Sequence, residues 1–104
     1  MAKNHPTGKS GLYKAILKLE TPEQCYRFFQ DVCSYSELSA MEQRYDIAEM
    51  LAEGRVYTDI KERTTASSAI ISRVNRVLSA DGSVLLRLIE EEQAEQAAPT
   101  NQPT

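Results

Sequence analysis

The residues with the clearest chemical character in this sequence are five basic side chains gathered between residues 54 and 80, in a stretch that holds two acids. The chain as a whole carries a formal net charge of −3, so this basic stretch stands against an acidic background. Guanidinium and ammonium groups bind phosphate oxygens, and local charge governs a small contact patch more than total charge does. The chemistry to expect here is binding of an anionic partner.

A helix over residues 68–79 would have two chemically different faces. One face is aliphatic and is expected to enter the core: Ile70, Ile71, Val74, Val77 and Leu78. The opposite face gathers short and basic side chains without an acid: Ala69, Ser72, Arg73 and Arg76. Small side chains let a helix enter the major groove of DNA, while arginines reach phosphates or guanine edges. An ordinary solvated face normally mixes both charge signs, so the pattern favours contact with double-stranded DNA.

The length and charge of each side chain on and near this face predict whether it contacts bases or phosphates. We expect four residues to read bases or lie on the groove floor: Ser68, Ala69, Ser72 and Arg76. Lys61 and Arg73 are expected to bind phosphates. Ser67 is the predicted N-cap of the helix, because a serine oxygen can accept a hydrogen bond from a first-turn N–H.

Groups that would support catalysis or metal binding are sparse. Cys25 and Cys33 lie eight residues apart with no CxxC spacing, which is typical of buried cytosolic thiols. The single histidine, His5, lies in a polar N-terminal stretch. No nucleophile–base pairing, metal spacing or phosphate loop is present in the sequence, so we expect neither an enzyme nor a bound metal or cofactor.

The elements that must position the basic face are predicted to be helices, about six in number. One helix begins after Thr21 as its N-cap, with Pro22 at its first position. Another runs from a Ser36 cap to Gly54, a natural C-terminal stop. The last begins beyond Gly82. No sustained alternation of apolar and polar residues predicts a strand, so the expected fold is all-α.

A polar break between two short helices connects these elements to DNA binding. Thr58 is predicted to cap a helix that ends near Thr64, and the next runs from the Ser67 cap to about Ser79. Two short helices joined by a tight turn form a helix-turn-helix. Thr65 stands where this turn commonly holds glycine, so either the turn geometry differs here or strain at positive φ is tolerated.

The helix over residues 36–53 is apolar around more than half of its circumference, with one acidic edge. A domain of roughly 80 residues has too small a core to enclose such a helix easily, so we expect a second copy to cover its far side in a homodimer. A monomer with an enclosed central helix is the alternative. Arg44 falls inside the apolar arc, where it needs an anion partner, an escape to solvent or a ligand to face.

The two ends of the chain are too polar to bury much surface. Residues 1–11 are expected to form a flexible basic arm and residues 93–104 a disordered tail, which leaves residues 12–92 as the folded domain. No apolar run is long enough to cross a membrane, and the N-terminus lacks the apolar core of a secretory signal. A cytoplasmic protein without a membrane partner is expected.

The segment "SELSAMEQRYDIAEMLAEG", followed by "ASSAIISRV" and "LSADGSVLLRLIEEE", resembles the Trp repressor family, and "CYRFFQDVC" fits its YerC/YecD-like branch. The resemblance covers residues 12–92. It implies an intertwined, all-helical homodimer that reads a palindromic operator through two helix-turn-helix heads. The implied function is transcriptional regulation, most simply repression, and the family accepts lysine at the position of Lys61.

The same resemblance carries an expectation about an effector. In this family the co-repressor L-tryptophan lies between two arginines, which match Arg44 and Arg73. The family pocket has glycine directly after the second arginine and a small polar residue further along, where this chain has Val74 and Val77. Valine is stiff at χ1 and would fill the space of the indole, so we expect L-tryptophan not to bind. Arg44 would then have a structural role or serve a smaller anionic effector.

A function of another class fits the same face. A helical dimerisation or adaptor module could use it to bind an acidic protein partner. Salt-dependent binding to arbitrary duplex DNA would favour the regulator, because release of counterions from DNA makes its binding steeply dependent on salt.

Overall fold

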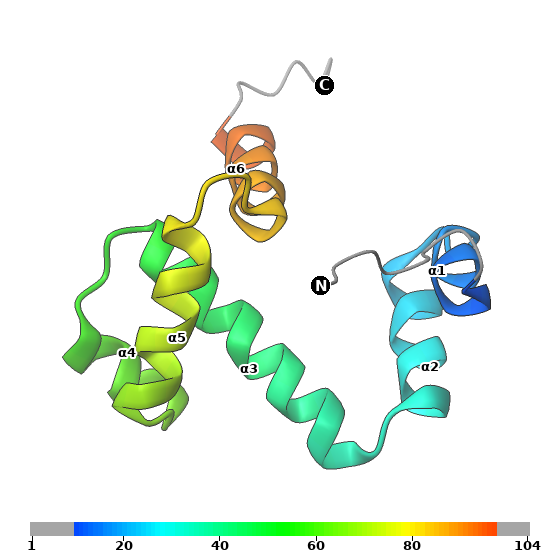
Figure 1. Cartoon of the computed structure of the whole chain (residues 1–104), viewed down its shortest axis with the longest axis horizontal. Coiled ribbons are helices and arrows are strands. Elements are labelled where there is room, and N and C mark those ends of the chain that lie inside the picture. The colour runs from blue at the N-terminus through cyan, green and yellow to red at the C-terminus, as the bar shows by residue number, and fades with distance from the viewer. Residues whose placement is uncertain (1–9, 98–104) are drawn as a thin grey trace, which may run out of the picture. The chain divides into compact units, whose positions relative to one another are not determined.

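The computed structural model of the chain describes residues 10–97, and every regular element within this range is a helix. Six helices follow one another along the chain (Figure 1): α1 (Gly11–Ile16), α2 (Pro22–Val32), α3 (Tyr35–Ala52), α4 (Tyr57–Thr64), α5 (Ser68–Ser79) and α6 (Val84–Ala97). The prediction of an all-α fold with about six helices is therefore confirmed. None of the helices in the described range is long and apolar enough to span a membrane.

The chain divides into two compact units, one ending at Leu38 and the other beginning at Ser39. In the first unit, Thr21 is the N-cap of α2 as predicted, and its side chain accepts a hydrogen bond of 3.1 Å from the Gln24 N–H. The Gln24 side chain in turn accepts a bond of 2.7 Å from the Glu20 N–H. Cys25 and Cys33 are unbonded to each other and half-buried, so the expectation of buried thiols was too strong.

Helix α3 begins earlier than predicted, because Ser34 and not Ser36 caps it. The Ser34 side chain accepts a bond of 3.2 Å from the Glu37 N–H, and the Glu37 carboxylate accepts one of 2.8 Å from the Ser34 N–H. These two bonds form a capping box. The Ser34 N–H, with the Ser34 hydroxyl adding to it, holds the pKa of the Glu37 carboxyl below its usual value. The helix ends at Ala52, and Gly54, the predicted stop, follows in the turn with a φ of +88°.

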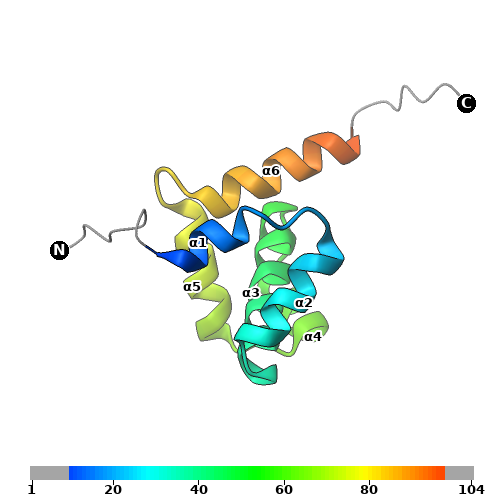
Figure 2. The same cartoon turned by 90° about the vertical axis from the view of Figure 1, so that its right-hand side faces the viewer.

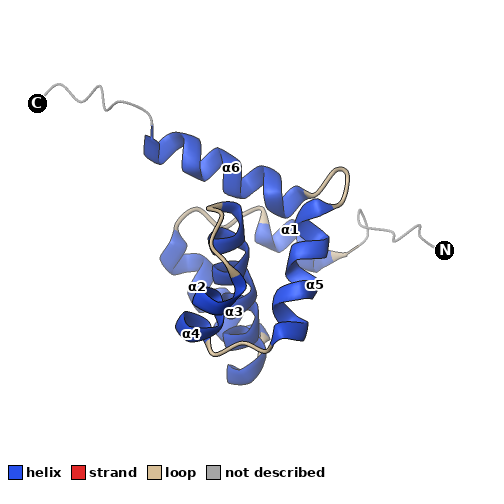
Figure 3. Ribbon diagram, turned by 90° about the vertical axis from the view of Figure 1, so that its left-hand side faces the viewer, coloured by secondary structure: helices blue, strands red, loops and turns tan. Residues whose placement is uncertain are grey.

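The core of the second unit is built from small and aliphatic side chains of all four of its helices. Its fully or almost fully buried residues are Ile47, Ala48, Ile60, Ala66, Ile71, Val74, Leu78 and Ile89. Figures 2 and 3 show α6 lying across the C-terminal ends of α3 and α5. The aliphatic face predicted for α5 enters this core except at Val77, which stays 45% exposed.

The start of α4 differs from the prediction. Val56, in an extended conformation, is the N-cap residue, and its carbonyl accepts the first helical bond from the Ile60 N–H at 3.1 Å. Thr58 therefore lies inside the first turn and caps nothing. No side chain caps this end, and an ion pair of 2.9 Å between Arg55 and Asp59 holds the first turn instead.

The turn between α4 and α5 shows which of the two alternatives for Thr65 is correct, a different turn geometry or tolerated strain at positive φ. Thr65 adopts the left-handed conformation, with φ 56° and ψ 18°, so the turn keeps its geometry without glycine. Its N–H donates to the Lys61 carbonyl at 2.9 Å. The Thr64 hydroxyl donates to the Ile60 carbonyl at 2.7 Å and accepts from the Ala66 N–H at 3.2 Å. Hydrogen bonds on both sides of Thr65 thus hold it in a conformation that is unfavourable for a β-branched residue.

The predicted domain boundaries lie close to the ends of the described range. Helix α6 continues to Ala97, so residues 93–97, expected in the C-terminal tail, are helical. Residues 1–9 of the expected arm and 98–104 of the expected tail lie outside the described residues.

Replacing Thr65 with glycine should stabilise the protein. Glycine removes the steric cost of about 1–2 kcal/mol for an L-residue in the left-handed conformation. Glycine also gives the unfolded chain more conformational entropy, which lowers stability by about 0.5–1 kcal/mol. The expected net gain in the free energy of unfolding is therefore about 0.5–1 kcal/mol. Urea unfolding of Thr65→Gly and the wild type at one protein concentration measures it. The control variant Thr64→Gly loses two hydrogen bonds of the Thr64 hydroxyl and should be less stable than the wild type. A Thr65→Gly variant that is less stable than the wild type would contradict the proposed strain at Thr65.

Candidate nucleic-acid interface and the adjoining pocket

The predicted contact face of α5 lies at the surface, on the side away from the core. Ser68, Ala69, Arg73 and Arg76 are exposed, and Ser72 is half-buried. Ser67 is the N-cap, as predicted, and its side chain accepts a bond of 3.2 Å from the Ile70 N–H. α5 contains no acidic residue, so its exposed face combines a cap, short side chains and two guanidinium groups without a competing carboxylate.

The basic residues of α4 and of the segment just before it divide into paired and unpaired groups. Arg55 and Arg63 both bind the Asp59 carboxylate, at 2.9 Å and 3.3 Å. These two bonds, that of Arg55 foremost, hold the pKa of Asp59 below its usual value. Lys61 is exposed and forms no ion pair within residues 10–97, so its ammonium is available to an outside anion.

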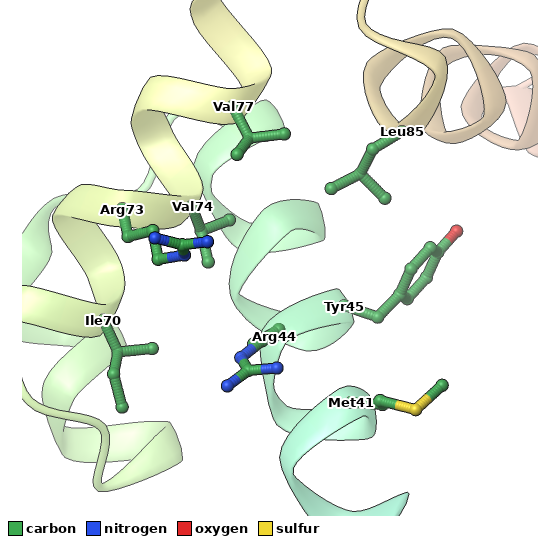
Figure 4. Close-up of a pocket in the computed structure, with 8 residues that line it drawn as sticks. All are labelled: Met41, Arg44, Tyr45, Ile70, Arg73, Val74, Val77 and Leu85. Carbon is green, nitrogen blue, oxygen red and sulfur yellow. The ribbon is translucent and has the colours of Figure 1, made fainter. Parts of the chain in front are cut away.

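A pocket of about 310 Å³ adjoins this face, between α3, α5 and α6. Its walls are mostly apolar, and Figure 4 shows its eight lining residues: Met41, Arg44, Tyr45, Ile70, Arg73, Val74, Val77 and Leu85. The guanidinium groups of Arg44 on α3 and Arg73 on α5 project into the space between these two helices. The structure thus brings together the two arginines that the sequence analysis linked.

Arg44 is exposed, so its place in an apolar arc does not bury its charge. Of the three alternatives, a structural ion pair finds no support in the described part of the chain, where no carboxylate pairs with Arg44 or Arg73. The guanidinium of Arg44 reaches solvent at the end of its stem, as the second alternative foresaw. Both cations can therefore bind an anion that enters the pocket.

The pocket also contains residues that the sequence analysis did not assign to a site. Met41 and Tyr45 could have been found, because they lie one turn apart on α3 beside Arg44. Ile70 was assigned to the core. Leu85 comes from α6 and joins the pocket through packing alone. Val74 and Val77 lie in the wall, on the same side of α5 as the Arg73 stem (Figure 4).

Acidic groups gather along one edge of α3, which holds Glu42, Asp46 and Glu49. Glu49 is half-buried there, and its pKa is raised chiefly by burial and further by Asp46, Glu53 and Glu92. Burial likewise raises the pKa of Tyr45, with Glu49 and Glu92 adding to it. The second unit therefore carries most of its negative charge on α3 and α6, and its unpaired positive charge on α4, on α5 and at Arg44 of α3.

The two sides of α3 differ in how well this chain covers them. Ile47 on one side is fully buried by the chain's own core. Met41 and Tyr45 on the other side remain 42% and 38% exposed. On α6, Val84 and Leu88 are exposed as well. The apolar side that is left uncovered is therefore that of Met41 and Tyr45.

Comparison with known proteins shows similarity over most of the chain. Residues 9–93 match the family described as Trp repressor protein. Uncharacterized protein YerC from Bacillus subtilis (strain 168) is 47% identical over 68 residues, which are 65% of this chain and 65% of that protein. The chain thus spans less than two thirds of the length of this relative.

Two solved structures are similar in fold as well as in sequence. A TrpR-like protein from Eubacterium eligens ATCC 27750 is 40% identical with a TM-score of 0.77, over 86% of this chain and 96% of that one. A Staphylococcus aureus protein, described as a candidate Trp repressor, is 34% identical with a TM-score of 0.78, over 86% and 89%.

The Asp59 ion pairs should make stability depend on acid pH. Because the pKa of Asp59 is lowered in the folded state, its stabilisation is present above the unfolded pKa of about 3.9 and is lost as pH falls through the folded value. Asp59→Asn should therefore be less stable than the wild type at pH 7, with a smaller difference at pH 3. Urea unfolding at both pH values tests this, with Asp31→Asn as a surface control. An equal loss at both pH values would contradict the electrostatic cause.

Proposed function

The chain belongs to the Trp repressor family, and we propose that it is a DNA-binding transcriptional regulator, acting as a repressor, that binds a palindromic operator as a homodimer. The observation that carries the proposal is the exposed face of α5, with its short side chains, its two arginines and no acid. Such a helix can enter the major groove with its N-terminal residues against the base edges.

Each residue of this face has a role in the proposal. Ser68, Ala69 and Ser72 lie on the groove floor, where short side chains allow close approach, and Arg76 reads a guanine edge. Arg73 and Lys61 bind phosphates, which set the register of the protein on the duplex. Ser67 caps α5, and its hydrogen bond to the Ile70 N–H keeps the first turn of the helix intact where it meets DNA.

The uncovered apolar side of α3 supports the homodimer. Met41 and Tyr45 lie there at intermediate to high exposure, and Val84 and Leu88 of α6 add further exposed apolar surface. Burial of such side chains is the usual driving force of association. A two-fold dimer would carry two copies of α5, one for each half-site of an operator whose half-sites lie about 34 Å apart, one turn of DNA.

The pocket beside α5 is the proposed effector site, with Arg44 and Arg73 as its cations. L-tryptophan is not its ligand in this proposal. Val74 follows Arg73 directly and is nine-tenths or more buried, so its branched side chain stands where a flat ring would need bare backbone. Val77 narrows the wall further. A smaller anion fits the two guanidiniums and the apolar walls better.

Selection of bound sequences from a random DNA pool tests the proposed function, and a palindromic consensus is expected. On that operator, Arg76→Ala should lose about 1–3 kcal/mol of binding free energy and relax preference at one position. Lys61→Ala should weaken all sequences alike and reduce the salt slope by about one unit. Failure to enrich any sequence, with retained binding to an acidic polypeptide, would instead support the adaptor function.

L-tryptophan should neither bind nor change operator affinity, because Val74 and Val77 occupy the space of its ring. Calorimetric titration of the protein, together with operator binding at zero and millimolar L-tryptophan, measures both effects. Val74→Gly provides the matched variant, since it reopens the wall after Arg73. Saturable heat at sub-millimolar L-tryptophan with the wild-type protein would overturn the steric argument.

A charge on the uncovered side of α3 should dissociate the dimer. Met41→Glu would bury an unpaired carboxylate in the proposed interface and should raise the dimer dissociation constant at least about tenfold, the equivalent of 1.4 kcal/mol. Sedimentation velocity across a concentration series measures it. Gln96→Glu adds the same charge at an exposed position of α6 and serves as the control. A wild-type chain that stays monomeric at micromolar concentration would refute the homodimer.

A further inference from the structure

The turn between α4 and α5 is tied to α3 by one side chain that the proposed interface does not use. The Gln43 amide nitrogen donates a hydrogen bond of 2.9 Å to the Thr64 carbonyl, across 21 residues of sequence. The other side-chain hydrogen bonds of α4 and of the turn join residues at most four apart. Gln43 is thus a long-range connection in a region otherwise held by local bonds.

The acceptor of this bond is a group that needs an external partner. Thr64 is the last residue of α4, and the final carbonyls of a helix have no N–H partner within it. The bond is partly buried, so water is a poor substitute for the amide of Gln43. Gln43 itself is half-buried on α3, where the core side chains Ile47 and Ala48 of the same helix hold its backbone in place.

The next residue along the chain is the strained one. Thr65 adopts its left-handed conformation directly after the carbonyl that Gln43 binds, and its hydroxyl also donates to that carbonyl. A β-branched residue prefers to leave this conformation, and strained residues persist only where their surroundings over-determine them. By holding the peptide between Thr64 and Thr65, Gln43 resists the rotation through which Thr65 would relax.

Relaxation of this turn would move the DNA-contacting residues far more than it moves the turn. Arg76 lies 11 residues after Thr65, so a helix between them carries it roughly 16 Å away at 1.5 Å per residue. A rotation of about 10° at the turn would displace Arg76 by about 3 Å, roughly the length of the hydrogen bond that it must make. Base reading requires that precision, whereas phosphate contacts are more tolerant.

We propose that Gln43 is a positioning residue for DNA recognition, whose amide holds the Thr64–Thr65 turn and so sets the direction in which α5 presents Ser72 and Arg76. The proposal rests on the proposed function. Gln43 itself touches no base in it. Its contribution is to sequence discrimination and passes through the turn.

The test uses the full chain and a double-mutant cycle. Gln43→Met keeps the length and shape of the side chain but removes the donor, and Thr65→Gly makes the left-handed turn free of strain. The two changes are made singly and together, with Gln96→Met as the control at an exposed position of α6. Affinity is measured for the selected operator and for a random duplex of equal length at one salt concentration.

Gln43→Met should weaken operator binding about tenfold, as for loss of one partly buried hydrogen bond, while binding to random duplex changes less than about twofold. Adding Thr65→Gly should restore most of the operator affinity, because glycine adopts the left-handed conformation without strain and the turn no longer tends to relax. Gln96→Met should change neither. An equal loss with and without Thr65→Gly, or an equal loss on both duplexes, would overturn the positioning role.

A second measurement keeps the proposal testable if the protein selects no DNA at all. Hydrogen exchange without DNA reports the amides of Thr65 and Ala66, which are bonded in the turn. Gln43→Met should speed their exchange, and Thr65→Gly should restore their protection in the double variant. Unchanged exchange in Gln43→Met would refute the role of Gln43 in the turn, whereas absent DNA selection with faster exchange would refute the DNA function alone.

Discussion

The left-handed turn at Thr65 is the constraint on which the arrangement of α4 and α5 depends. It reverses the chain within three residues, so that Ile60 before it and Ile71 after it are both fully buried in one core. Every neighbouring polar group contributes to it: the hydroxyl of Thr64, the N–H of Ala66, the carbonyl of Lys61 and the amide of Gln43. A strained residue held on all sides is a common way for proteins to fix a surface that must match a partner.

The distribution of charge follows from how the helices pack around this turn. The carboxylates of α3 and α6 meet near Glu49 and Tyr45, where burial raises the pKa of these two groups and the neighbouring carboxylates add to it. The unpaired cations of α5 are exposed, and Asp59 neutralises part of the positive charge around α4. In the proposed function, repulsion of the acidic edge by phosphates favours an approach to DNA through α5. The overall negative charge of the chain does not oppose such binding.

The pocket between α3, α5 and α6 supports the proposal that this chain keeps two cations and takes a ligand other than L-tryptophan. Arg44 and Arg73 remain on facing helices, while Val74 belongs to the core and to the pocket wall at once. A residue with both roles couples ligand choice to stability: a smaller residue there would open the pocket and leave a cavity in the core. The exposed apolar side of α3 adjoins the same pocket through Met41 and Tyr45, so a second copy on that side would close the pocket.

The sequence by itself determined the features that depend on residues within one helical turn of each other. The caps at Thr21 and Ser67, the stop at Gly54, the helical fold and the basic face of α5 all follow from spacings of three or four residues. Even the family membership rests on such segments. Local patterns failed where two local signals compete, as at Thr58, where the carbonyl of Val56 and the pair between Arg55 and Asp59 begin α4 earlier.

Only the tertiary structure decided the features that depend on how separate helices meet. The bond of Gln43 to Thr64 spans 21 residues, and no local pattern marks either partner. Val77 has the spacing of a core residue and yet lines a pocket, because α3 and α6 leave its end of α5 open. Arg44 lies on an apolar arc and yet reaches solvent. Helical periodicity says which side chains share a face, but only packing decides whether another helix, solvent or a pocket lies against that face.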